Sequence, residues 1–134
     1  MKMKKVLITF SVVLISLMGF STIETSAAPT ANASITTFNA GGDTGVRGSG
    51  GFVGGRADEV DKVKYRFTLY RKGIEKGKKE GTTNSSTYSA TLSNYEYSNT
   101  STLWKMVSFG TAYFNYGGNE SDQDSAQMYV RAYH

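Results

Sequence analysis

Carboxylates are the only side chains of catalytic character that the sequence offers in number. They gather in two segments, residues 58–61 and residues 120–124. The chain has no cysteine, and its single histidine is the last residue, His134. Thiol catalysis, a multi-histidine zinc site and a Ser-His-Asp relay are therefore excluded, because the required side chains are missing. Two facing carboxylates could hydrolyse a glycoside, but solvated loop acids explain the pattern more simply, and we expect no enzyme activity.

Oxygen-bearing side chains follow one another through residues 119–124, which we expect to form a polar hairpin loop. Calcium takes about six to eight oxygen ligands, and Asp122 and Asp124 are the candidates that this segment offers. The spacing of an EF-hand is absent, since the segment has neither the central glycine nor the closing glutamate. A loop kept soluble by its acids is the preferred interpretation, and we expect no cofactor.

A cluster of four lysines lies near the middle of the chain, within and beside a predicted polar strand at residues 76–83. Its members are Lys72, Lys76, Lys78 and Lys79. Such a cluster could contact a polyanion such as a cell-wall polymer. Lysines on an exposed edge strand also prevent sheets from pairing edge to edge, and Glu75 and Glu80 dilute the positive field. We favour edge protection and keep polyanion contact as the alternative.

Tyrosine is abundant, with nine residues, and three of them lie near asparagines. Tyr88, Tyr95 and Tyr97 could stack on sugar rings while neighbouring amides bind the sugar hydroxyls. The alternative is that tyrosine is simply a favoured strand residue, whose ring covers a sheet while its hydroxyl stays in water. Because tyrosines occur in most of the predicted strands, this alternative is preferred.

The N-terminus has the pattern of a secretory signal peptide. Three lysines within the first five residues precede an apolar run at residues 6–20, and small residues follow up to Ala28. We predict a signal peptide at residues 1–27 with cleavage after Ala27, and cleavage after Ala28 or Ala33 is the alternative. The mature protein is then expected to be secreted, extracellular and without stable membrane insertion, because no second apolar stretch of spanning length occurs.

The mature chain, residues 28–134, has the length of one domain. The signal peptide contains three lysines and one glutamate, so the mature chain keeps 12 basic and 10 acidic residues, a net charge of +2. A nucleic-acid partner is not expected, because the basic excess belongs mostly to the segment that is removed. With no cysteine to form disulfides, the domain must depend on its hydrophobic core, and this composition fits secretion from a Gram-positive cell.

Apolar and polar residues alternate through most of the mature chain, which is typical of strands with one buried face. The clearest case is residues 62–71, where Val63, Tyr65, Phe67 and Leu69 point one way. Residues 116–119 predict a reversal that pairs the last two strands, and only residues 56–61 could form a helical turn. The predicted strands are residues 34–38, 45–53, 62–71, 76–83, 87–92, 103–116 and 123–133.

Seven short strands in about 100 residues indicate an all-β fold, a single antiparallel immunoglobulin/fibronectin-like β-sandwich. The phase of residues 103–116 stays open, because both faces of this segment are apolar. The predicted core consists of Val63, Tyr65, Phe67, Leu69, Tyr88, Leu92, Trp104, Met106, Met128 and Val130.

In strand order the mature chain resembles small secreted β-sandwich proteins of Gram-positive bacteria. The shared pattern is a glycine- and serine-rich strand at residues 48–52, an alternating strand at residues 62–71 and a final hairpin. This resemblance implies secretion and a sandwich fold, and no activity. Residues 93–95 are also similar to the tyrosine-rich style of lactococcin-type bacteriocins, but the histidines usual there are missing.

Three functions follow as expectations. The first is a non-catalytic protein with a binding or structural role at the cell surface or in the medium, whose partner is a cell-wall polymer or another surface protein. The second is a secreted antimicrobial protein of the bacteriocin or toxin kind. The third is a carbohydrate-binding module for the cell wall. The sequence specifies neither the ligand nor the oligomeric state.

Overall fold

The computed structural model describes residues 28–133. The predicted signal peptide at residues 1–27 and the histidine at position 134 lie outside the described residues. No helix long and apolar enough to cross a membrane occurs in the part of the chain that the structure describes.

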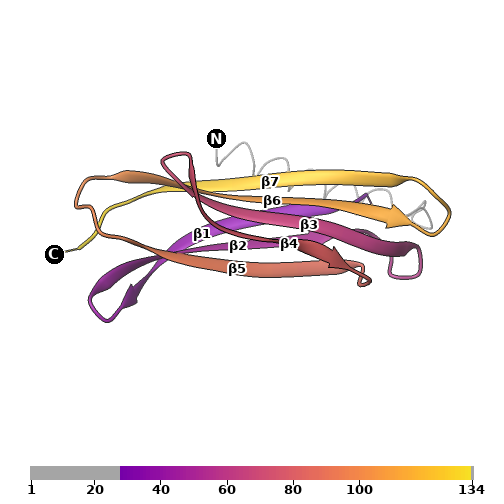
Figure 1. Cartoon of the computed structure of the whole chain (residues 1–134), viewed down its shortest axis with the longest axis horizontal. Coiled ribbons are helices and arrows are strands. Elements are labelled where there is room, and N and C mark those ends of the chain that lie inside the picture. Colours follow the sequence, from indigo (N-terminus) through magenta and orange to yellow (C-terminus); the bar gives the residue numbers. More distant parts are fainter. Residues whose placement is uncertain (1–27, 134) are drawn as a thin grey trace, which may run out of the picture.

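Seven antiparallel strands form two sheets that pack face to face (Figure 1). One sheet has three strands in the order β1-β2-β5, and the other has four in the order β4-β3-β6-β7. This arrangement confirms the predicted all-β sandwich. The strands are β1 (Thr30–Ala40), β2 (Asp43–Val53), β3 (Val60–Arg71), β4 (Ile74–Thr83), β5 (Thr87–Glu96), β6 (Thr102–Phe114) and β7 (Asn119–Val130).

Several strand limits differ from the prediction. Strand β1 begins four residues earlier than expected, at Thr30, and pairs with β2 along its whole length. Strand β7 begins at Asn119, so the predicted polar loop at residues 119–124 is wrong and these residues belong to the strand. The reversal itself lies at residues 115–118, where Gly117 and Gly118 have positive φ angles of 99° and 86°. Residues 56–60 form one hydrogen-bonded turn, in which the carbonyl of Arg56 accepts hydrogen bonds from the backbone N–H groups of Glu59 and Val60.

The hydrophobic core lies between the two sheets. Every predicted core residue is buried or partly buried, and Val63, Phe67, Leu69, Trp104 and Met106 are fully buried. Residues 104, 106, 108, 110, 112 and 114 of β6 are all buried, which settles the phase that the sequence left open. The remaining buried apolar residues are Ala31, Ile35, Val46, Phe52, Val60, Ala112, Phe114, Val130 and Ala132.

Two glycines allow the sheets to approach each other closely. A side chain at Gly110 of β6 would overlap the ring of Phe52, and one at Gly50 of β2 would overlap Ser108 and meet Phe67. The large rings of one sheet therefore fill space that the other sheet leaves open. The opposite sheet thus approaches the glycine-rich strand β2 closely at Gly50.

Candidate binding surface on the four-stranded sheet

The outer face of the four-stranded sheet combines cationic, aromatic and amide side chains in ordered rows. Because side chains alternate along a strand, the residues that lie between the buried ones point outward. Arg66 of β3 pairs with Phe109 of β6, which pairs with Gln123 of β7. Two outward rows along, Tyr70 pairs with Lys105, and Lys105 with Gln127. Neighbouring strands thus place a cation beside an aromatic ring in both rows.

Cations on this face lie over aromatic rings. The guanidinium carbon of Arg66 is 5.4 Å from the ring centroid of Phe109. The Nζ atoms of Lys62 and Lys64 lie 5.3 Å and 5.5 Å from the ring centroid of Tyr113. These distances fall within the range of cation–π attraction. The aromatic rings of β6 therefore help to hold the charged groups of β3 along one line.

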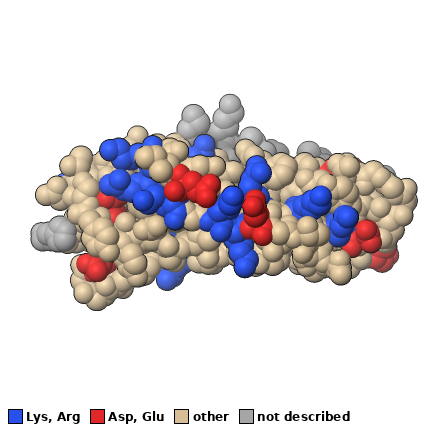
Figure 2. All heavy atoms as spheres, in the orientation of Figure 1, with Lys and Arg blue, Asp and Glu red and all other residues tan. Residues whose placement is uncertain are grey.

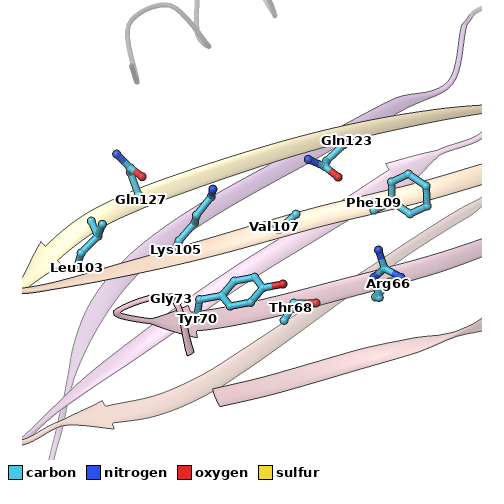
Figure 3. A pocket seen from close by; sticks show the side chains of 10 residues that line it. All are labelled: Arg66, Thr68, Tyr70, Gly73, Leu103, Lys105, Val107, Phe109, Gln123 and Gln127. Atoms are coloured by element: carbon cyan, nitrogen blue, oxygen red, sulfur yellow. The ribbon is translucent and has the colours of Figure 1, made fainter. Parts of the chain in front are cut away.

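A shallow groove of about 440 Å³ runs over these rows (Figure 3). Its side chains come from three adjacent strands, β3, β6 and β7, and project from the same side of the sheet. Arg66 and Lys105 supply positive charge, and Gln123 and Gln127 supply amide groups. The other lining residues are Thr68, Tyr70, Gly73, Leu103, Val107 and Phe109.

Carboxylates are absent from the outward positions at residues 62–70, 103–113 and 123–129. Asp122 and Asp124 of β7 point away from the groove, toward β1. Asp122 accepts a hydrogen bond from the backbone N–H of Ala31 at 2.8 Å, and Asp124 accepts one from that of Ala33 at 3.0 Å. Figure 2 shows basic side chains along the length of the molecule, with acidic groups between them. The groove itself is lined by positive and neutral side chains.

Asp122 and Asp124, the two calcium candidates, are thus hydrogen-bonded to the backbone of β1. Their bonds to β1 connect the edges of the two sheets where no backbone ladder joins β1 to β7. Across residues 28–133 no group of three or more His, Cys, Asp or Glu side chains could hold a metal ion. The two carboxylates therefore act here as acceptors for backbone amides.

None of the four predicted lysines lines the groove, and they lie on the neighbouring turn and edge strand, called here the margin. Lys72 is in the turn after β3, with a φ of 52°, and the other three are on β4, an edge strand. Lys78 contacts Glu80 at 3.5 Å, and Glu80 pairs with Arg66 across the strands. This margin carries both signs of charge, and its lysines suit the protection of an edge strand. The charged side chains that β3 and β6 present to the groove are both cations, Arg66 and Lys105.

The three candidate tyrosines separate into two places. The ring of Tyr88 stacks on that of Tyr65, with centroids 3.7 Å apart and planes inclined by 12°. Hydrogen bonding between them raises the pKa of Tyr65. Tyr95 and Tyr97 lie together near the end of β5 and are exposed. Tyr88 is therefore committed to packing between the sheets, and only Tyr95 and Tyr97 form an open pair.

Two of the acids at residues 58–61 share one cation. Asp58 binds Arg56 at 2.9 Å, and Glu59 approaches the same guanidinium at 3.8 Å. The carbonyl of Asp58 also accepts a bond from the side-chain amide of Asn115. These contacts order the turn between β2 and β3, so the segment has a structural explanation.

A buried charge cluster at the other end of the sandwich was not foreseen in the sequence. Glu96 is 1% exposed and accepts two bonds from Arg71, both at 2.9 Å. It also accepts bonds from the indole N–H of Trp104 at 2.8 Å and from the backbone N–H of Ser98 at 2.9 Å. Burial acts to raise the pKa of Glu96, but these hydrogen bonds outweigh it and hold the pKa at about 2. The cluster joins β3, β5 and β6 across the two sheets.

Arg66, Lys105 and Phe109 are functional candidates that sequence reasoning missed. The alternation of residues 62–71 already placed Lys62, Lys64 and Arg66 on the wet face of a strand. Their grouping with Lys105 and Phe109 depends on how β3 pairs with β6. The sequence therefore showed the cations of β3, but their grouping with Lys105 and Phe109 required the register between β3 and β6.

The chain matches no protein-family model and no curated protein. Solved structures with a similar course of the chain include that of AT1g01470 from Arabidopsis thaliana, 9% identical, with a TM-score of 0.44 over 73% of this chain and 77% of that one. The structural-genomics target SoR45 is 8% identical, with a TM-score of 0.42 over 77% and 87%. The sporulation control protein Spo0M from Bacillus subtilis is 12% identical, with a TM-score of 0.30 over 77% and 50%. At these values the likeness carries no conclusion about function.

Proposed function

We propose that this protein is a secreted, non-catalytic binding module that attaches to an anionic polymer of the cell envelope. The binding surface is the outer face of the four-stranded sheet. The observation that supports this proposal is the carboxylate-free groove in which Arg66 and Lys105 lie beside Phe109 and Tyr70. Secretion rests on the signal-peptide pattern of residues 1–27.

The spacing of the cations suits a linear polyanion. Outward residues two apart on a strand recur about every 7 Å, so Lys62, Lys64 and Arg66 form a regular line of charge along β3. Lys105 adds a charge on the adjacent strand opposite Tyr70, about 14 Å further along the sheet than Arg66. A polymer with phosphate or carboxylate groups in each repeat can meet several of these cations at once. The rings and glutamine amides between them can contact the uncharged part of each repeat.

Binding of this kind is expected to be modest and sensitive to salt. The groove is open to solvent, and exposed charges are screened beyond about 8 Å at physiological ionic strength. The mature chain also carries a net charge of only +2, so long-range attraction is weak. Affinity must come from several short contacts made together.

Two variants of equal net charge test where binding occurs. The groove variant is Lys64→Gln/Arg66→Gln/Lys105→Gln, and the margin variant is Lys72→Gln/Lys76→Gln/Lys79→Gln. All six side chains are exposed, so both variants should keep the wild-type circular dichroism spectrum. Retention on purified anionic cell walls is measured at low and at physiological salt.

We expect wild-type retention to fall sharply as salt increases, and the groove variant to lose most retention even at low salt. The margin variant should lose clearly less. Equal losses in the two variants would show that only net charge matters and would overturn the assignment of the groove. Retention by the wild type that does not change with salt would overturn the electrostatic proposal altogether.

A further inference from the structure

A second group of aromatic residues lies on the outer face of the opposite, three-stranded sheet. Phe38 of β1, Gly45 of β2 and Tyr95 of β5 form one row across this sheet. Tyr97 follows two residues after Tyr95, just beyond the end of β5. The ring centroids of Phe38 and Tyr95 are 6.3 Å apart, and those of Tyr95 and Tyr97 are 6.2 Å apart. The three rings form one cluster, called here the aromatic platform.

The innermost ring of the platform is fixed by its surroundings. A side chain at Gly45 would overlap the ring of Phe38, so the ring lies against bare backbone. The guanidinium carbon of Arg47 lies 4.3 Å from the centroid of the same ring. Phe38 therefore has neighbours on its faces and serves as the support of the platform.

The two tyrosines are the open part of the platform. Tyr95 is 41% exposed and Tyr97 66% exposed. Their planes are inclined by 28°, and at their separation neither ring covers the other as Tyr65 covers Tyr88. Two rings held near each other in water offer apolar surface whose burial by a ligand is favourable.

The groups on one side of the platform are hydroxyls. Thr36 of β1 and Ser93 of β5 lie in the next row across the sheet, on either side of Arg47. On the other side of the platform the next row is Ala40 and Asp43, so one exposed carboxylate lies on the same face. The positive charge of Arg47 is directed onto Phe38. The platform thus joins flat apolar rings to neutral hydrogen-bonding groups on one side and a single carboxylate on the other, in contrast to the cationic groove of the other sheet.

We propose that the aromatic platform is a second binding site, which takes a neutral sugar ring of a glycan chain. A pyranose presents a face of C–H groups that can lie on a tyrosine ring, and hydroxyls at its edge that can bond to Thr36 and Ser93. An anionic ligand gains little attraction here, since the guanidinium of Arg47 already lies over the ring of Phe38. The site lies on the sheet opposite the groove, so one molecule can hold a polyanion and a glycan at the same time.

A chitin tetrasaccharide, an uncharged chain of N-acetylglucosamine, is the probe for this site. Its binding to the mature protein is measured by isothermal titration calorimetry at low and at physiological salt. We compare the wild type with Tyr95→Ala/Tyr97→Ala and with the control Tyr129→Ala, whose side chain is 69% exposed on β7 of the other sheet. Because the replaced rings are exposed, all three proteins should keep the same melting temperature.

We expect affinity for the tetrasaccharide to fall at least about tenfold in Tyr95→Ala/Tyr97→Ala and to remain unchanged in Tyr129→Ala and at higher salt. Binding of a glycerol-phosphate oligomer, which carries no sugar ring, should be the same in the wild type and in Tyr95→Ala/Tyr97→Ala at low salt, so this test is independent of the groove. No binding of the tetrasaccharide by the wild type, or equal binding by the double variant, would overturn the second site.

Discussion

Replacing Glu96 by glutamine should destabilise the fold more than any other conservative change of charge in the described chain. Glutamine has nearly the same shape, so the substitution removes the charge and one acceptor while leaving the packing in place. Arg71, which donates two hydrogen bonds to Glu96, then loses its counter-charge. Trp104 can keep its bond to the remaining oxygen.

Two routes give a similar magnitude for this loss. Removing one member of a buried ion pair typically costs about 3–5 kcal/mol. The lower end applies here, because the Arg71 side chain is 30% exposed and water can replace part of the contact. Independently, the pKa of Glu96 is lowered from 4.5 to about 2, and each unit corresponds to about 1.4 kcal/mol. Both routes predict a loss of about 3 kcal/mol at neutral pH.

The pH dependence has a definite sign. A carboxyl whose pKa is lower in the folded state stabilises the fold above its unfolded-state pKa, and this stabilisation is lost as pH falls through the folded-state value. The difference in stability between wild type and Glu96→Gln should therefore be constant above about pH 5. It should then shrink as pH falls from 4.5 toward 2.

Urea unfolding followed by circular dichroism and by tryptophan fluorescence measures this difference. Trp104 is the single tryptophan and contacts Glu96 directly, so its emission reports on the cluster. Asp58→Asn is the matched control, because its ion pair with Arg56 is exposed and should contribute less than about 1 kcal/mol. The reasoning about the buried cluster is wrong if Glu96→Gln unfolds at the same urea concentration as the wild type. It is also wrong if the stability difference between the two proteins does not change with pH.

Three further substitutions test the fold. Phe67→Ala should lower the free energy of unfolding by about 3–5 kcal/mol, because the ring is fully buried, and a wild-type melting temperature would contradict the assigned face. Gly110→Ala should cost about 1–3 kcal/mol in urea unfolding, since the added methyl group overlaps Phe52; an unchanged midpoint would show that the sheets can separate there. Asp122→Ala/Asp124→Ala should lower the melting temperature and expose β1 to protease, because two amides of β1 lose their acceptors; equal protease resistance would contradict this.

The fold could be predicted because its strongest signal is local. Strand β3 shows alternation over residues 62–71, and Val63, Phe67 and Leu69, which were expected to be buried, are fully buried. Val60 and Thr68 are also buried, which the alternation did not predict. The limits of β7 were missed for a physical reason. Acids such as Asp122 are typical of solvated loops, and here they bind the backbone of a strand that is 91 residues away in sequence. Such a contact depends on the packing of the two sheets, which no local pattern specifies.

The binding surface could be predicted only in part. The line of cations on β3 is visible as the polar half of an alternating pattern. Phe109 and Tyr113 could not be assigned to the same face of the sheet as these cations, because residues 103–116 are apolar on both sides. The pair of Arg71 and Glu96 is separated by 25 residues, and neither residue is distinctive in its own segment. Both features arise from pairing between strands that are distant in sequence.

The most direct test of the central claim is an NMR titration of the mature protein with a short glycerol-phosphate oligomer. The side-chain amides of Gln123 and Gln127 lie in the groove, whereas that of Asn94 lies near the opposite edge and contacts the carbonyl of Lys76. We predict that the signals of both glutamines shift with added oligomer and return as salt is added, while the signal of Asn94 stays in place. Glutamine signals that do not move at saturating oligomer, or shifts confined to Asn94 and β4, would contradict the account.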